Sequence, residues 1–220
     1  MTRAILIFLF LLLAPSRASA QEPITWKIDN LKDIGGSSPT VTGTPRVTKD
    51  STGKAISFDG KGDGILIHRN PIAGARAFTI EGIFRPEAGG DFEQRWLHVQ
   101  DDTIDDRALL EIRVTGNEWF LDTFIKSGEN RLTLSAEKFK HPVGRWYHVA
   151  LVFDGAVMRH YVDGQEEMSG PLKASPLGPG KTSLGVRMNH VSWFKGAIRE
   201  VRFTQRALAP TEFMKKTIPR

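Results

Sequence analysis

The chain has 220 residues, with 30 lysines and arginines against 25 acidic residues, a formal net charge of +5, and no cysteine. Without cysteine it has no disulfide, no thiolate metal site and no lipid anchor on an N-terminal cysteine, so core burial alone must hold the fold together. The basic residues are spread along the sequence with no block of five like charges, which argues against nucleic-acid binding.

The first 20 residues have the pattern of a secretory signal peptide. Arg3 precedes an apolar run over residues 4–14, and Ala18-Ser19-Ala20 forms a small-x-small cleavage site. This run is too short for a membrane span, which needs about 20 apolar residues, and no later stretch is long enough either. We therefore predict cleavage after residue 20 and a single domain over residues 21–220, secreted or periplasmic. The absence of cysteines and of Asn-x-Ser/Thr acceptors favours a bacterial setting.

From residue 24 onward, short apolar segments alternate with turns rich in Gly, Pro, Asp and Asn. They predict strands over residues 24–28, 55–58, 65–67, 77–86, 96–99, 108–114, 119–125, 132–134, 146–153, 157–162, 182–187 and 193–204. The only predicted helix covers residues 210–216, with Pro210 at its start and lysines at its end. This spacing leaves no room for helical crossovers, so we predict an all-β antiparallel jelly-roll sandwich of two sheets with a short C-terminal helix.

Two details of this strand pattern are testable. The segment 146–153 is apolar on both faces, which predicts a strand in the middle of a sheet. If Asp154 and Gly155 form a two-residue hairpin turn, His148 pairs with Tyr161 on the next strand. In the last strand Ile198 is three residues before Val201, so in a regular strand the two side chains would lie on opposite faces of the sheet. This indicates either that both faces of the strand are buried or that a bulge shifts its register.

Several segments together resemble the laminin-G-like jelly-roll domains of the concanavalin A-like lectin/glucanase superfamily. They are Ala55-Ile-Ser-Phe-Asp-Gly60, residues 78–86, Trp146-Tyr-His-Val-Ala-Leu-Val-Phe-Asp-Gly155, Tyr161-Val-Asp-Gly164, and residues 194–203 with 206–208. The resemblance covers about residues 55–213. It implies two curved antiparallel sheets with a concave face that often carries the ligand, and it leaves the function open.

A calcium site is not predicted, although the resemblance raises the question. Many relatives carry Asp where this chain has Arg199, and a fixed cation there repels a second one. Asp59 and Asp63 offer carboxylates for calcium, but we expect them to bond their own turn. The acidic run over residues 101–106 lacks the features of a calcium loop and is expected to be solvated.

No catalytic residue is predicted. The Glu-x-Asp-x-x-Glu motif of the related retaining glucanases is missing, and Glu118 and Asp122 lie about 13 Å apart if they share a strand. That separation exceeds the roughly 5.5 Å of a retaining carboxylate pair. Carboxylate pairs formed across strands remain open at this level. The six histidines show no zinc-binding spacing, and no serine-hydrolase motif occurs.

Aromatic residues are the candidate ligand contacts, because sugars stack on aromatic rings. The candidates are Trp193 with His190, Trp96 with His98, and Trp119. For each tryptophan the alternative is a place in the core, and Trp193 is the strongest exception because it follows a polar loop.

The sequence favours an exported, non-catalytic binding module for an extracellular glycan or a protein partner. The alternatives are a glycan-active hydrolase or lyase of the same superfamily and a structural or interaction domain of the cell envelope.

Overall fold

The computed structural model describes residues 22–215, so the predicted signal peptide, residues 1–20, lies outside the described residues. The first sheet has the strand order β14-β13-β12-β6-β16-β4-β3, and β1 also pairs with β16. Its strands are β1 (Ile24–Lys27), β3 (Arg46–Asp50), β4 (Gly53–Asp59), β6 (Phe78–Pro86), β12 (Tyr147–Phe153), β13 (Val157–Val162), β14 (Gln165–Pro171) and β16 (Lys195–Thr204).

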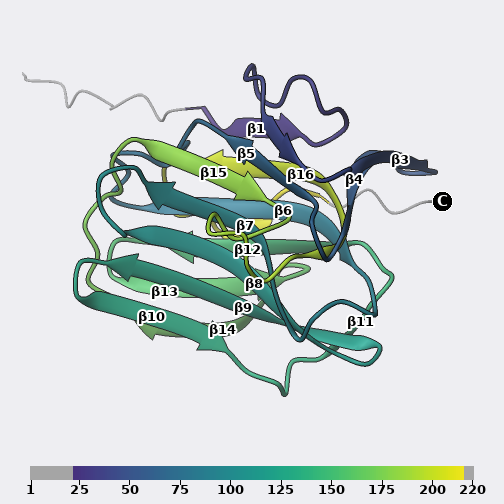
Figure 1. Cartoon of the computed structure of the whole chain (residues 1–220). Helices are drawn as coiled ribbons and strands as arrows, with labels where there is room; N and C mark the ends of the chain where they lie inside the picture. Colours follow the sequence, from purple (N-terminus) through teal and green to yellow (C-terminus); the bar gives the residue numbers. More distant parts are fainter. Residues whose placement is uncertain (1–21, 216–220) are drawn as a thin grey trace, which may run out of the picture.

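The second sheet has the order β10-β9-β8-β7-β15-β5-β2, and β11 also pairs with β9. Its strands are β2 (Thr40–Thr42), β5 (Gly64–Ile67), β7 (Glu93–Asp101), β8 (Arg107–Thr115), β9 (Glu118–Ser127), β10 (Asn130–Ser135), β11 (His141–Pro142) and β15 (Gly180–Leu184). In Figure 1 this sheet lies in front of the first one. The predicted two-sheet antiparallel jelly-roll sandwich is confirmed. Within residues 22–215, no helix combines the length and apolar character that a membrane span requires.

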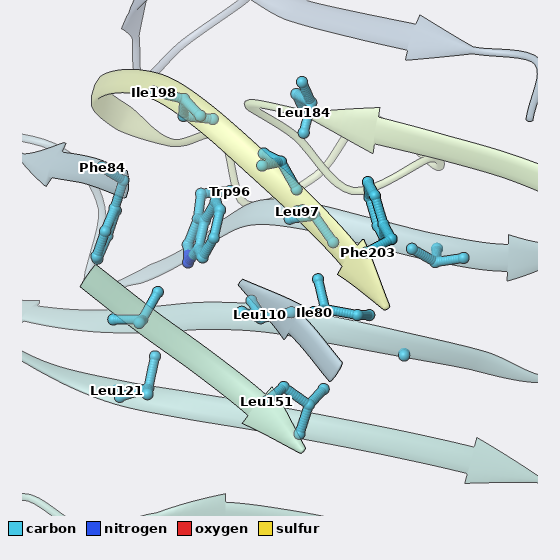
Figure 2. Close-up of a cluster of buried hydrophobic side chains, with 14 of the residues drawn as sticks. Ile80, Phe84, Trp96, Leu97, Leu110, Leu121, Leu151, Leu184, Ile198 and Phe203 are labelled. Carbon is cyan, nitrogen blue, oxygen red and sulfur yellow. The ribbon is translucent and has the colours of Figure 1, made fainter. Parts of the chain in front are cut away.

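The core fills the space between the two sheets. Most strands contribute alternate side chains, for example Ile80 and Phe84 from β6 and Leu110 from β8. Figure 2 shows these side chains converging from both layers around Trp96, whose ring stacks on Phe84 with centroids 4.9 Å apart. Gly82 lies directly beside this ring, and a Cβ atom there would come within 2.4 Å of it. Burial of this apolar surface is the main source of stability in a chain without disulfides.

The strand β12 lies between β6 and β13, and every one of its residues is buried, as its apolar sequence predicts. The predicted two-residue turn after it is wrong. Phe153 pairs with Met158 and Leu151 with His160, which leaves a four-residue connection. The cause is Asp154, whose carboxylate accepts hydrogen bonds from the backbone N–H groups of residues 156 and 157 and so widens the turn.

The last strand contains the irregularity that its sequence indicates. The register of β16 against β6 shifts between Ile198 and Glu200, so Arg199 is the extra residue of a β-bulge and has no partner residue on β6. Ile198 and Val201 then both face the core. The bulge interpretation is therefore correct.

The predicted C-terminal helix is shorter than expected. Only one turn of 3₁₀ helix forms, Pro210–Glu212, and Phe213 already has an extended backbone. Residue 216 lies outside the described residues. The chain straightens because Phe213 packs on Tyr161 on the outer face of the first sheet, while the N–H of Met214 donates to the buried Glu81. Tertiary packing thus outweighs the weak helical preference of this segment.

Candidate functional site

The outer face of the second sheet carries charged and aromatic side chains. Along β8, alternate residues point into the core, and those between them point outward: Arg107, Leu109, Glu111 and Arg113. Residues that pair across neighbouring strands lie on the same face of the sheet. Arg95 on β7 and Asp122 on β9 pair with Glu111, and Phe124 on β9 pairs with Leu109, so these side chains also point outward. The sequence folds this way because charged and apolar residues alternate in β8.

A loop over residues 185–193 crosses this face and is fastened to β7. The N–H of Arg95 donates to the carbonyl of Ser192, and the N–H of Met188 donates to Nδ1 of His98. His190 and Ser192 have left-handed backbone conformations, with φ of 59° and 58°. Such conformations are costly for residues other than glycine, so the surrounding contacts must hold the loop in this shape. The loop separates two recesses on the sheet.

The first recess, which we call the arginine recess, has a volume of about 220 Å³. It lies over β7, β8, β9 and β10 beside the loop. Its lining residues are Arg95, Arg107, Leu109, Glu111, Arg113, Phe124, Thr133 and Arg187. Four guanidinium groups thus surround one small hollow on the face of the sheet.

Two carboxylates lie at the base of this face, Glu111 on β8 and Asp122 directly opposite on β9. They are 3% and 1% exposed, and each is bound by an arginine: Glu111 by Arg95, and Asp122 by Arg113 at 2.6 Å. Burial raises the pKa of Glu111 to about 7, and the neighbouring Asp122 acts in the same direction against the effect of Arg95. Burial also raises the pKa of Asp122. The pair therefore resists carrying two negative charges.

Arg187 and His98 lie on the side of the recess next to the loop. The Arg187 side chain is half-buried and forms no hydrogen bond or ion pair with any residue from 22 to 215. Burial lowers the pKa of Arg187, and the charges of Arg107 and Arg95 lower it further. His98 is fully buried, and burial together with these arginines lowers its pKa to about 3. At neutral pH His98 is uncharged, and the arginines supply the positive charge.

The second recess, the His190 recess, has a volume of about 190 Å³ and lies on the other side of the loop, over β5 and β15. Its lining is Thr42, Gly64, Ile65, Leu66, Lys181, Ser183, Val186, Met188 and His190. His190 is exposed, and its ring lies 5.6 Å from that of the half-buried Trp193. Trp193 packs beside Gly64, where a Cβ atom would lie 3.5 Å from the ring.

Three of the five residues predicted from sequence come together here. His190 and Trp193 lie on the loop, and their assignment as ligand contacts stays a prediction. His98 lies beneath the loop, is 1% exposed and accepts a hydrogen bond from the N–H of Met188, so a surface ligand does not reach it in this structure. Trp96 and Trp119 are 0% exposed and belong to the core between the sheets. A surface ligand does not reach either ring in this structure, and we correct the sequence-based proposal for these two residues.

Sequence reasoning missed Phe92, the most exposed aromatic residue among Phe, Trp and Tyr within residues 22–215. It is 57% exposed, its ring lies 6.4 Å from that of Phe120, and the Arg113 guanidinium carbon lies 5.9 Å from its centroid. The sequence-based prediction of sugar-stacking rings was limited to tryptophans and therefore did not include Phe92. The outward arginines were also missed, although the alternation in residues 107–113 carried a signal for two of them, Arg107 and Arg113.

The candidate calcium ligands bond to the protein itself. The Asp59 carboxylate accepts hydrogen bonds from the N–H groups of Lys61 and Gly62, and that of Asp63 accepts from the N–H of Thr44. Arg199 lies 3.8 Å from the centroid of the Trp146 ring and bonds Asp50. Among residues 22–215, no group of three or more acidic or histidine side chains has the arrangement of a metal site.

We expect added calcium to raise the melting temperature by less than about 1 °C, because the candidate carboxylates already accept backbone donors and Arg199 adds a fixed cation. The measurement is differential scanning fluorimetry of chelator-treated protein, with magnesium as the control. An increase of several degrees that is specific to calcium would contradict this expectation.

The family is decided by a comparison with family models. A laminin-G-type model, described as the concanavalin A-like lectin/glucanases superfamily, matches residues 59–213. The chain belongs to this superfamily. This confirms the resemblance found in the sequence, and the matched part includes both recesses apart from Thr42. A search of curated protein sequences gave no match.

Several solved structures share the fold of this chain. Domain 4 of AbnA, an extracellular GH43 arabinanase from Geobacillus stearothermophilus solved with arabinotriose, has a TM-score of 0.63 and 21% identity over 86% of this chain and 94% of that one. The botulinum neurotoxin serotype D binding domain has a TM-score of 0.62 and 14% identity over 86% of this chain. This chain spans about half of that toxin domain, 49%.

A heptameric SAP-like pentraxin from Limulus polyphemus has a TM-score of 0.57 and 16% identity over 74% of this chain and 81% of that one. At these identities the similarities concern the fold alone. They place the chain among two-sheet sandwiches and leave its ligand to be argued from its own residues.

Proposed function

We propose that the chain is an exported, non-catalytic module that binds a glycan on the outer face of the second sheet. The observation that carries this proposal is the combination, on one face, of an exposed aromatic ring at Phe92 with a recess lined by guanidinium groups and the Thr133 hydroxyl. Aromatic rings bind the C–H faces of sugars, while arginine and hydroxyl groups hydrogen-bond their oxygens.

Related structures give the proposal further support. The arabinanase domain was solved with arabinotriose, and the toxin domain is described as a binding domain. Both share the fold of this chain at low identity, so they support a binding role and leave the ligand open. A protein partner on the same face is the competing outcome, which a glycan-binding experiment tests directly.

A second candidate function, glycan hydrolysis, is kept because of the carboxylate pair on β8 and β9. Directly paired residues have Cβ atoms about 5 Å apart, which is in the range of a retaining pair, and a pKa of about 7 suits a general acid. Against this, Glu111 and Asp122 are almost fully buried and held by arginines. A catalytic acid and nucleophile must reach the sugar, so we favour binding without cleavage.

Two assays on the full chain separate these functions. Affinity gel electrophoresis against a panel of neutral and acidic polysaccharides measures binding, and a reducing-end assay on the same polymers measures cleavage. The proposal expects retardation by at least one polymer without release of reducing ends. Release that disappears in Glu111→Gln would establish the hydrolase instead.

Phe92→Ala is expected to weaken binding of the retained polysaccharide about tenfold, because an aromatic stacking contact contributes about 1–1.5 kcal/mol. The ring is 57% exposed, so its removal should leave the melting temperature nearly unchanged. Val47→Ala is the matched control: it removes an exposed apolar side chain, 45% exposed, from β3 of the opposite sheet. Equal affinity of Phe92→Ala and wild type would remove this ring from the binding site.

A further inference from the structure

The arginine recess contains one guanidinium, that of Arg187, that has no partner among residues 22–215. We propose that it binds an anionic group, a carboxylate or a sulfate ester, on the glycan, with Arg187 as the central contact. This inference rests on the proposed function and adds the chemical class of the ligand.

The first support is the state of Arg187. Among residues 22–215 its guanidinium has no ion-pair or hydrogen-bond partner, and it is half-buried next to Arg107 and Arg95. Placing like charges together out of water is unfavourable unless an anion is present. The Arg187 guanidinium is accessible within the recess, so it can donate hydrogen bonds to a ligand that carries the opposite charge.

The second support is the contrast with the other three arginines of the recess. Arg95 is bound by Glu111 and Glu93, Arg113 by Glu93 and Asp122, and Arg107 by Asp105. These ion pairs hold the neighbouring guanidiniums in place. Arg187 comes from the loop and lies outside this network, so it is free to contact a ligand.

The third support is a row of basic residues that borders the recess. Register pairing aligns Lys181 on β15, Arg107 on β8, Lys126 on β9 and Arg131 on β10, with Gln100 of β7 between the first two. Asp105 pairs with Arg107 and Lys126, and Asp102 with Lys181, whereas Arg131 is exposed. A row of this kind suits a polymer with a repeated anionic group more than a single small anion.

Guanidinium chemistry sets the ligand class. The planar fork of arginine donates two parallel hydrogen bonds to a carboxylate or sulfate, and such charge-assisted pairs are stronger than bonds to a neutral hydroxyl. The neutral imidazole of His98 beneath the loop adds no competing charge at pH 7. The recess is therefore built for an anionic sugar substituent, and a neutral sugar would leave Arg187 without a counter-charge.

The test measures binding of polygalacturonate, dextran sulfate and neutral dextran to the full chain by affinity electrophoresis and calorimetry. Polygalacturonate carries carboxylates and dextran sulfate carries sulfates, so the two arms identify the anionic group. We expect one of them to bind at least about tenfold more tightly than dextran, from one charge-assisted contact. Equal binding of all three, or binding of dextran alone, would overturn the inference while leaving a neutral-glycan module intact.

Variants separate a specific contact from general attraction to a basic protein. Arg187→Gln is expected to lose about tenfold or more in affinity for the anionic polymer, and Arg187→Lys to lose less, because lysine keeps the charge without the fork. Lys49→Gln removes one charge from an exposed position on β3 of the opposite sheet and is the control. An equal loss in Lys49→Gln and Arg187→Gln would overturn the inference. Unchanged melting temperatures show that the variants are folded, and Arg187→Lys preserves the test if Arg187→Gln does not fold.

Discussion

Replacing Trp96 with alanine is expected to lower the free energy of unfolding by about 3–5 kcal/mol. The indole is 0% exposed, stacks on Phe84 and fills the space beside Gly82, so its removal leaves a large cavity in the core. The measurement is equilibrium denaturation in urea, followed by circular dichroism. Trp96→Phe keeps most of the volume and is expected to cost clearly less, which keeps the test informative if the alanine variant does not fold.

Phe92→Ala is the matched control, because it removes an aromatic ring that is 57% exposed. Its stability should remain close to that of wild type. A different result would reverse our assignment: if Trp96→Ala kept native stability but lost ligand binding, the ring would be a ligand contact, as the sequence first indicated.

Glu111→Gln is expected to become more stable relative to wild type as the pH rises from 5 to 8. Burial raises the pKa of Glu111 from 4.5 to about 7, so between these values the folded protein holds a proton that the unfolded chain has released. Folding stability from this group therefore falls with rising pH over that interval. Glutamine carries no such proton, and the variant should gain about 1–3 kcal/mol on wild type across the range.

The groups around Glu111 determine how large this effect is. Arg95 and Glu93 face it from β7, Arg113 from its own strand and Asp122 from β9. The two arginines favour the charged form, while the two acids and burial oppose it. The measurement is urea denaturation at pH 5, 6, 7 and 8, with Glu118→Gln, an exposed change on β9, as the control. A stability difference between Glu111→Gln and wild type that stays constant with pH would contradict the raised pKa.

Strand alternation and turn residues were enough to predict the sandwich, because both act locally. The central position of β12 followed from its apolar sequence, and the alternation in the last strand left either two covered faces or a bulge, of which the structure has the bulge. The register of the hairpin between β12 and β13 could not be predicted in this way. It depends on hydrogen bonds from two backbone N–H groups to the Asp154 carboxylate, which give a four-residue connection in place of a two-residue turn. The predicted length of the C-terminal helix was wrong for a similar reason: packing of Phe213 on the sheet stabilises the chain more than another turn of helix would.

The tryptophans show how far the alternation of side chains along a strand can predict which residues are buried. Trp119 shares its face with Leu121 and Ile125, an apolar row that already indicated the core. Trp96 is harder, because a bulge next to it lets Trp96 and the following Leu97 both face the interior while His98 points outward. A regular strand would have placed Trp96 and His98 together, which is what the sequence led us to expect.

The arginine recess was beyond sequence reasoning for a different reason. Its residues come from β7, β8, β9, β10 and the loop over residues 185–193, and only the sheet order brings them to one face. The unpaired state of Arg187 depends on contacts across these elements. Such a site has no spacing signature, so it becomes visible only when the strands are placed side by side.

The most direct test of the account is an amide NMR titration of the ¹⁵N-labelled chain with an acidic oligosaccharide such as trigalacturonate. We predict saturable shifts confined to Phe92, β7, β8, β9, β10, β15 and the loop over residues 185–193, with Arg187 among the most affected residues, and no response to a neutral oligosaccharide of equal length. Saturable shifts located instead on the first sheet, or an equal response to the neutral sugar, would contradict the claim that this face binds an anionic glycan.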